Sequence, residues 1–309
     1  MGFDDAAAVA RTVDNLERND GKHPGFRRAQ ARGTVLTGVF TPSGAAAELT
    51  TAAHLQQDEV PVTVRFSNSS GNPDVPDTAR VVRGMTVRFA LPGGAYTDLI
   101  GVSIPVFLAP TPQAFMEAVD AIEPDPATGA PDVAKVGAYI VKYPRTAAAF
   151  ATANEQPPAS YATIRYWALH AFVWRGPAGR TQAVRYRWEP DAGVAGQQDL
   201  DGLPFDYLTR EIETRASAGF SLHVQLAEPG DPTDDATQAW PDDRPEIVAG
   251  HLQLTGPVAD QAGWDAKGFD PTNLTDGIEL SDDPLLAFRH ATYAESVRRR
   301  SAERGLTRP

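Results

Sequence analysis

The sequence contains no cysteine among its 309 residues. This absence excludes disulfides, thiolate metal sites, iron–sulfur clusters, a cysteine nucleophile and a haem held through thioether bonds or a thiolate ligand. Long apolar runs are missing too. Every window of about 18 residues contains polar side chains, so no membrane-spanning helix is predicted. Residues 1–20 carry early acidic side chains and no apolar stretch, which is not the pattern of a signal peptide. We therefore expect a cytoplasmic protein.

Positive charge is also scarce, since 28 lysines and arginines face 40 aspartates and glutamates, a net charge of −12. This balance does not suit a general nucleic-acid binder, and we expect none as a partner. Hydrophobic residues make up 42% and charged residues 22% of the chain, as in globular proteins. A chain of this length can bury a large core and enclose a cofactor.

Alternating apolar residues, rich in β-branched side chains, predict strands in two blocks of the chain. Glycine and proline turns separate the strands of the second block, as in an antiparallel barrel or sandwich. Helices are predicted over 4–19, from Gln113, over 131–153 and over 203–216. No internal repeat is present, so we expect one domain with a β core dressed by helices. The predicted strands are 33–42, 60–67, 79–91, 164–175, 181–190, 219–230 and 246–257.

A last helix is predicted to begin near Pro284, capped by Asp282 or Asp283. On this helix Arg289 and Tyr293 are four residues apart and share one face. A guanidinium beside a phenol favours the phenolate, and a phenolate is a suitable ligand for ferric haem iron. An isolated pair of this kind is far more often a surface contact, so the interpretation needs support from other parts of the chain.

Arginines in the first third of the chain give that support. Haem carries two propionates, which need arginine or similar donors. Arg27, Arg65, Arg80 and Arg83 lie in or beside the first predicted strands. Taken alone, each of them is more typical of a surface charge.

Taken together, several stretches resemble the haem catalase family in order and spacing. The resemblance covers about residues 23–300. It includes similarity of HAFVWRGPAGRTQAVRYRWEP (170–190) to the central strands of that family. Because the chain is much shorter than a full catalase, it resembles the compact branch, the catalase-related peroxidases. The other matching stretches are R-x-x-Q-A-R-G (27–33), VRFS (64–67), DTARVVRG (77–84), D-L-I-G-x-x-x-P (98–105) with Phe115 downstream, and R-x-x-x-Y (289–293).

The resemblance implies an α+β fold, namely a catalase-like eight-stranded antiparallel β-barrel with surrounding helices and without the large C-terminal extensions. A single haem-binding domain would then cover 1–309, with a helical arm (1–22), a barrel with inserted helices (23–257) and a C-terminal segment (258–309). The implied cofactor is ferric haem b. The implied partners are a small-molecule substrate and a second copy of the chain in a homodimer.

The resemblance also implies roles for individual residues. Tyr293 falls on the axial ligand of the haem iron, and Arg289 on the partner that keeps it ionised and lies near a propionate. Arg27 and Arg65 fall on propionate-binding positions, and Phe115 on the aromatic residue that stacks against the haem.

The chain departs from the family pattern on the distal side of the haem, where Ser67 keeps its expected place. The position of the distal histidine holds Gln30, and that of the distal asparagine holds Val102. An amide hydrogen-bonds but cannot carry the proton that peroxide cleavage moves, and valine offers no hydrogen bond. An alternative is that His23 or His54 replaces the histidine. Further candidate lining residues are Val35, Ile104 and Phe107.

Three functions are compatible with these residues. The first is a haem peroxidase-like oxidoreductase that acts on peroxide or organic hydroperoxide with little true catalase activity. The second is a repurposed haem enzyme that rearranges a hydroperoxide, as catalase-like allene oxide synthases do, or acts on a nitrogenous substrate bound to iron. The third is a haem-binding protein without catalysis. The consumption of hydroperoxide with and without an electron donor separates them.

Overall fold

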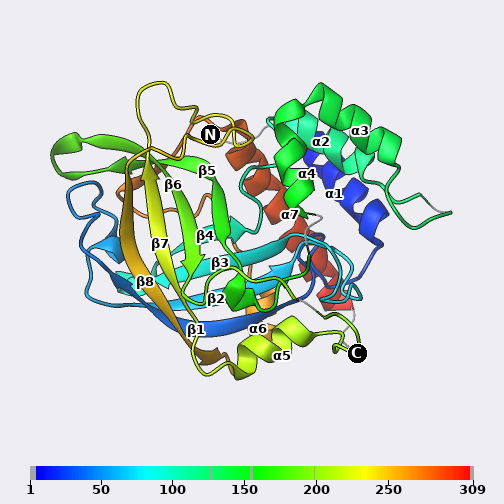
Figure 1. The fold of residues 1–309 in the computed structure, drawn as a ribbon, viewed down its shortest axis with the longest axis horizontal. Helices are drawn as coiled ribbons and strands as arrows, with labels where there is room; N and C mark the ends of the chain where they lie inside the picture. The colour runs from blue at the N-terminus through cyan, green and yellow to red at the C-terminus, as the bar shows by residue number, and fades with distance from the viewer. Residues whose placement is uncertain (1–4, 126, 154–155, 198, 307–309) are drawn as a thin grey trace.

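The computed structural model describes residues 5–125, 127–153, 156–197 and 199–306, and eight antiparallel strands form a closed barrel in it (Figure 1). The strands follow one another in the order β4-β3-β2-β1-β8-β7-β6-β5, and the pair Val102–Trp167 closes β4 onto β5. A short strand, β9 (Ile278–Leu280), adds to β5. The predicted barrel is therefore confirmed. Its strands are β1 (Gly33–Pro42), β2 (Val60–Asn68), β3 (Arg83–Ala90), β4 (Tyr96–Val102), β5 (Tyr166–Arg175), β6 (Thr181–Pro190), β7 (Gly219–Leu226) and β8 (Glu246–Pro257).

The two-residue alternation of each strand sends one set of side chains into the barrel and the other outward. The inward set forms the main hydrophobic core, which includes Leu36, Phe66 and Val87. The outward set on β1–β4, here called the outer face, carries Arg65 and Ser67 of β2. These two outward side chains are buried although they point away from the barrel, because helices and loops cover that part of the outer face.

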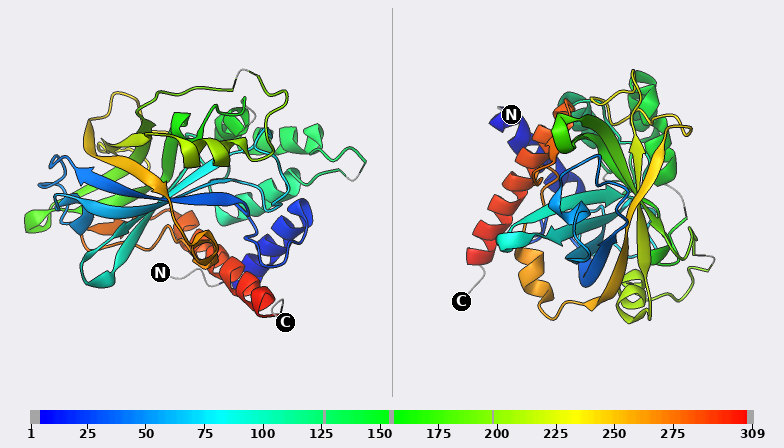
Figure 2. Two further views of the ribbon diagram at one scale, coloured as in Figure 1. Left: turned by 90° about the horizontal axis from the view of Figure 1, so that it is seen from below. Right: turned by 90° about the vertical axis from the view of Figure 1, so that its left-hand side faces the viewer.

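The helices surround one side of the barrel, and the longest, α7, lies beside α1 (Figure 2). α2, α3 and α4 form a group next to them (Figure 1). Asp5 caps α1 and Thr111 caps α2 through their side-chain oxygens, as expected for short polar residues at these positions. The helices are α1 (Ala6–Asp20), α2 (Pro112–Ala121), α3 (Val133–Lys142), α4 (Ala147–Ala153), α5 (Tyr207–Thr214), α6 (Gln261–Ala266) and α7 (Pro284–Leu306).

Several predicted boundaries differ from the structure for identifiable reasons. The strand predicted from residue 79 begins only at Arg83, because the buried Arg83 guanidinium binds the carbonyl oxygens of Asp77, Ala79 and Val81 and holds them as a loop. The helix predicted over 131–153 is interrupted at Pro144, which lacks the backbone N–H that a continuous helix needs. Strand β4 was not among the predicted strands.

No helix within the described residues has the length and hydropathy needed to cross a bilayer. Residues 1–4 of the predicted N-terminal arm and 307–309 of the predicted C-terminal segment lie outside the described residues.

Candidate active site

A chain of four hydrogen-bonded side chains runs from the start of α7 to the phenol of Tyr293. Asp283 Oδ1 accepts from the backbone N–H of Leu285 at 2.9 Å, and its Oδ2 lies 2.7 Å from His170 Nδ1. His170 Nε2 lies 2.7 Å from one terminal nitrogen of Arg289, whose other terminal nitrogen donates to the Tyr293 hydroxyl at 2.8 Å. The predicted one-turn spacing therefore does bring the guanidinium of Arg289 to the phenol.

The direction of these hydrogen bonds fixes the protonation of His170. A guanidinium can only donate, so the Nε2 atom facing Arg289 has no proton, and Nδ1 carries the proton that is donated to Asp283. Burial lowers the pKa of His170, with Asp283 acting in the opposite direction and Arg289 in the same one. The imidazole is therefore neutral, and it positions Arg289 without competing with Tyr293 for its charge.

Sequence reasoning missed this part of the site. The sequence pattern predicts Asp283 only as a helix cap and assigns no role in the site to His170. Both side chains are almost completely buried. The signal that could have identified His170 is its place in a strand of mostly apolar residues, where a buried histidine needs a polar partner such as a carboxylate.

On the outer face of the barrel, Gln30, Ser67 and Val102 meet around Gly84. Strand pairing places Ser67 on one side of Gly84 and Val102 on the other. A Cβ atom on Gly84 would lie 3.0 Å from both Gln30 Nε2 and Ser67 Oγ. Glycine at this position thus makes room for the Gln30 amide. The structure brings together all three residues that the sequence predicted for the distal side.

The backbone of Gln30 has an unusual, left-handed conformation. Its φ angle is 57°, and it is the only described residue other than glycine with a positive φ. Its N–H donates to the Ser69 carbonyl at 3.2 Å, and its carbonyl accepts from Arg65 at 2.9 Å. A left-handed conformation at a non-glycine residue costs energy and is found disproportionately at functional sites. These two hydrogen bonds offset that cost and fix the direction of the side chain.

Neither alternative histidine joins this set in the structure. The His54 ring lies 4.6 Å from the ring of Phe89, which belongs to the barrel core, whereas Ser67 and Val102 lie on the outer face. Burial lowers the pKa of His54 to about 4. His23 lies in the turn after α1, with Nε2 3.1 Å from the carbonyl oxygen of Asp20.

Four arginines form a cluster beside the distal residues, gathered around Asp265 near the C-terminal end of α6: Arg27, Arg65, Arg300 and Arg304. Arg27 is hydrogen-bonded to the Asp265 carboxylate, and Arg65 lies 3.5 Å from it. Arg27 and Arg300 both donate to the carbonyl oxygen of Lys267 at 2.8 Å. Burial and the charge of Arg27 lower the pKa values of Arg65 and Arg300 to about 9. The cluster therefore holds more positive charge than its single carboxylate balances.

The cluster also has unused donors. Within the described part of the chain, the Nε atoms of Arg65 and Arg300 are buried and lack a hydrogen-bond partner. Buried donors normally have partners, so this arrangement is suited to one or more additional carboxylates. Arg27 and Arg65 were predicted for such a role, whereas Arg300 was not. Its position seven residues after Tyr293, which places both on one helix face, is the signal that could have identified it.

An apolar wall completes the site on the side of α2. The rings of Phe115 and Phe107 are parallel with centroids 5.7 Å apart, and Phe115 meets Phe288 of α7 edge-on at 5.8 Å. Phe115, Val102 and Trp167 pack against the same buried cluster. Phe115 thus lies where the last helix and β4 come together, in surroundings suited to a flat apolar ligand.

Comparison with known proteins agrees with this geometry. Residues 10–305 match the family described as Catalase. The chain is 37% identical over 308 residues to a catalase-related peroxidase of Mycolicibacterium paratuberculosis (strain ATCC BAA-968 / K-10), covering 97% of both chains. It is 36% identical to a catalase-related peroxidase of Synechococcus elongatus (strain ATCC 33912 / PCC 7942 / FACHB-805), covering 99% of this chain and 92% of the relative. Catalase A from Saccharomyces cerevisiae superimposes with a TM-score of 0.81 at 20% identity, covering 94% of this chain and 64% of that one.

The chain belongs to the catalase family. Within the family, two relatives that the chain covers to more than nine tenths both carry the name catalase-related peroxidase. The family implies a haem cofactor, and the residues present fit one. A phenol paired with a guanidinium suits the iron, arginines with unused donors suit the propionates, and the rings around Phe115 suit the porphyrin.

Proposed function

We propose that this protein is a haem peroxidase-like oxidoreductase that reduces organic hydroperoxides and hydrogen peroxide and has little true catalase activity. Its relatives of similar length are named catalase-related peroxidases, which supports this proposal. The cofactor that we propose is haem b in the ferric state. When bound, it supplies the redox chemistry, because it stores the two oxidising equivalents released by cleavage of an O–O bond.

On the proximal side, Tyr293 would be the axial ligand of the iron. Arg289 donates a hydrogen bond to the phenolic oxygen at 2.8 Å and so stabilises negative charge on it. Neutral His170, oriented by Asp283, holds Arg289 in that position. Arg27, Arg65 and Arg300 would bind the propionates.

The observation that carries the proposal is the chemistry of the residues around Gly84. Gln30 donates and accepts hydrogen bonds but does not take up a proton, and Val102 does neither. General acid–base catalysis contributes about 10²–10⁴-fold to a rate, so its loss slows the cleavage of hydrogen peroxide strongly. The amide of Gln30 and the hydroxyl of Ser67 can still orient a hydroperoxide. The apolar side chain of Val102 suits an alkyl group better than water.

The test compares two oxidants on the haem-loaded protein. We expect slow oxygen release from hydrogen peroxide. We also expect consumption of cumene hydroperoxide that requires an electron donor such as 2-methoxyphenol, with two donor molecules oxidised for each hydroperoxide. Oxygen electrode traces and the absorbance of the oxidised donor measure the two reactions.

Two results would overturn the proposal. Vigorous oxygen release would mean that a proton carrier is present after all. Rapid loss of the hydroperoxide without a donor would indicate rearrangement in place of reduction. The haem-free protein serves as the control for both measurements.

The oligomeric state and location form a smaller part of the proposal. We propose a homodimer in the cytoplasm, which sedimentation of the purified protein and cell fractionation test. The absorption spectrum of the pyridine complex of the extracted cofactor tests haem b.

A further inference from the structure

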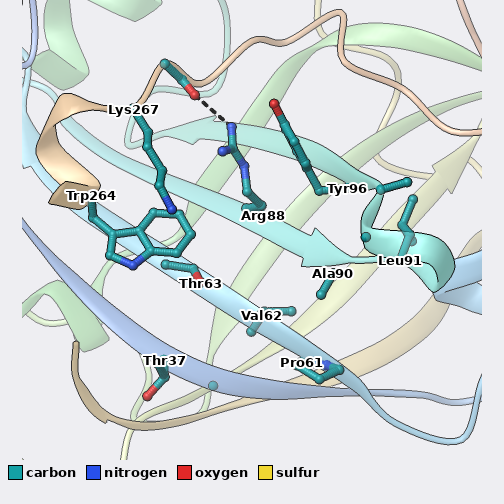
Figure 3. A pocket seen from close by; sticks show the side chains of 14 residues that line it. Thr37, Pro61, Val62, Thr63, Arg88, Ala90, Leu91, Tyr96, Trp264 and Lys267 are labelled. Atoms are coloured by element: carbon teal, nitrogen blue, oxygen red, sulfur yellow. Dashed lines mark hydrogen bonds between the residues drawn. The ribbon is translucent and has the colours of Figure 1, made fainter. Parts of the chain in front are cut away.

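A second candidate site lies on the outer face of the barrel, separate from the residues around Gly84. It is a groove of about 690 Å³, within the size range of small-molecule sites. On β2, Thr63 is the outward-facing residue that precedes Arg65, and it lines the groove. Thr63 pairs with Thr37 of β1 and Arg88 of β3. The groove thus begins one outward residue beyond the arginine cluster. Figure 3 shows it bounded by Trp264 and Lys267 on one side and by Tyr96 and Leu91 on the other.

The walls of the groove are aromatic and rigid. Arg88 makes two hydrogen bonds to the buried Asp98 at 2.7 and 2.8 Å, and a third to the carbonyl oxygen of Gly268 at 2.7 Å. Its guanidinium lies 3.9 Å from the centre of the Tyr96 ring, which is 46% exposed. Arg88 is therefore a structural support that presents Tyr96, and its charge is already paired.

Lys267 is the charged group at the rim that can bind a ligand. Its side chain is exposed, and Nζ lies 3.5 Å from the centre of the Trp264 ring. Within the described ranges of the chain, no carboxylate forms an ion pair with it. In a protein with a net charge of −12, a cation that lies on the Trp264 ring without a carboxylate partner is a local attraction for an anion.

The segment 264–267 contributes both to the groove and to the arginine cluster. Trp264 and Lys267 face the groove, whereas Asp265, which follows Trp264, pairs with Arg27 and Arg65. The backbone carbonyl of Lys267 accepts hydrogen bonds from Arg27 and Arg300. A molecule in the groove therefore lies one short segment away from the cations that we assign to the propionates.

We propose that this groove binds the reducing substrate, a phenolic carboxylate, with its ring against Thr63 and Ala90 in the space between the two rims and its carboxylate on Lys267. The inference rests on the proposed peroxidase function, which requires an electron donor. Each phenol loses one electron and its phenolic proton and becomes a phenoxyl radical. Two phenols supply the two electrons and two protons that convert one hydroperoxide into an alcohol and water as the O–O bond breaks.

Calorimetric titration of the haem-loaded protein with 4-hydroxybenzoate tests the groove without any peroxide. We expect Lys267→Gln to weaken binding of this probe about two- to fivefold, the scale of one exposed ion pair. Binding of the uncharged 4-hydroxybenzamide should not change in this variant. Ala90→Phe, at an exposed position lining the groove, should weaken binding of both probes because its ring occupies the same space.

Lys142→Gln is the matched control, because Lys142 also lies over an aromatic ring, that of Tyr143 at 5.1 Å, but far outside the groove lining. It should leave binding of both probes unchanged. The proposal is overturned if Lys267→Gln and Ala90→Phe bind 4-hydroxybenzoate as tightly as the unaltered protein does. Failure of the proposed function would appear separately, as a lack of hydroperoxide consumption by the unaltered protein with 2-methoxyphenol.

Discussion

The two sides of the candidate haem site differ in how completely their polar groups are paired. On the proximal side, Asp283, His170, Arg289 and Tyr293 form one continuous hydrogen-bonded chain in which each group fixes the next. On the distal side, no hydrogen bond joins the side chains of Gln30 and Ser67 to another group of the described residues, and Val102 offers no polar atom.

The difference indicates which property of the site the chain keeps and which it changes. A buried chain of paired charges holds a ligand atom in a defined electrostatic state, which is a requirement of any haem bound through a phenolate. The distal residues decide which substrate reacts and how protons move. In the function that we propose, the protein would combine a catalase-like means of holding iron with a distal surface in which Gln30 and Val102 carry no proton.

The largest effect is expected from Tyr293→Phe, which removes the only phenol at the end of the proximal chain. The tyrosinate-type absorption spectrum of the haem-loaded protein should disappear completely, because phenylalanine has no oxygen to bind iron. Tyr143→Phe, which removes a hydroxyl bonded to Glu117, is the control and should keep the spectrum. An unchanged spectrum in Tyr293→Phe would show that another residue is the ligand.

Asp283→Ala should destabilise the protein by about 2–4 kcal/mol, because it removes a buried hydrogen bond to a carboxylate together with a helix cap. The change leaves the Nδ1 proton of His170 without its acceptor and removes the cap of α7. Asp282→Ala, at the exposed neighbouring position, should change stability by less than about 0.5 kcal/mol. Urea denaturation measures both. Equal effects would mean that the proximal chain is not tightly coupled.

Lowering the pH should destabilise the protein through His170 on the proximal side and His54 in the barrel interior. Gln30, Ser67 and Val102 have no group that takes up a proton in this pH range. Burial depresses the folded-state pKa of His170 and that of His54, the latter to about 4. The unfolded chain then takes up protons at about pH 6.5 while the folded protein does not, so stability is full above that pH and falls as the pH decreases towards 4. For His54 the loss amounts to about 3 kcal/mol.

Urea midpoints at several pH values in this range check the prediction. In a His54→Phe background, the remaining loss reports on His170. A midpoint that is independent of pH in that background would contradict the neutral form of His170 deduced from its hydrogen bonds.

The smallest effect is expected from Gln30→His, which restores a proton carrier to the distal side. Histidine tolerates positive φ better than most side chains, so the backbone at this position should accept it. Oxygen release from hydrogen peroxide should rise about tenfold, below the full range of general acid–base catalysis because Val102 remains. Gln30→Ala should show no rise. A gain in the alanine variant would point to access, rather than proton transfer, as the limiting factor.

Local patterns in the sequence were enough to predict most of the barrel and part of the site. Alternation predicted β1, β2 and β5–β8, and the one-turn spacing of Arg289 and Tyr293 on a helix predicted their contact. The replacement of a histidine by Gln30 is also visible in the sequence. Each of these features depends on neighbours within a few residues, for which backbone geometry leaves few options.

Only the tertiary structure showed which distant residues complete the site. His170 reaches Asp283 across 113 positions and Arg289 across 119, and Arg300 meets Arg27 through the carbonyl oxygen of Lys267. Contacts of this kind follow from the closure of the barrel and the docking of α7 against it. The sequence by itself determined the strands, the last helix and the chemistry available at each position. The folded chain decided which of those groups are buried together, because a buried charge or donor has a defined role only once its partner is in place.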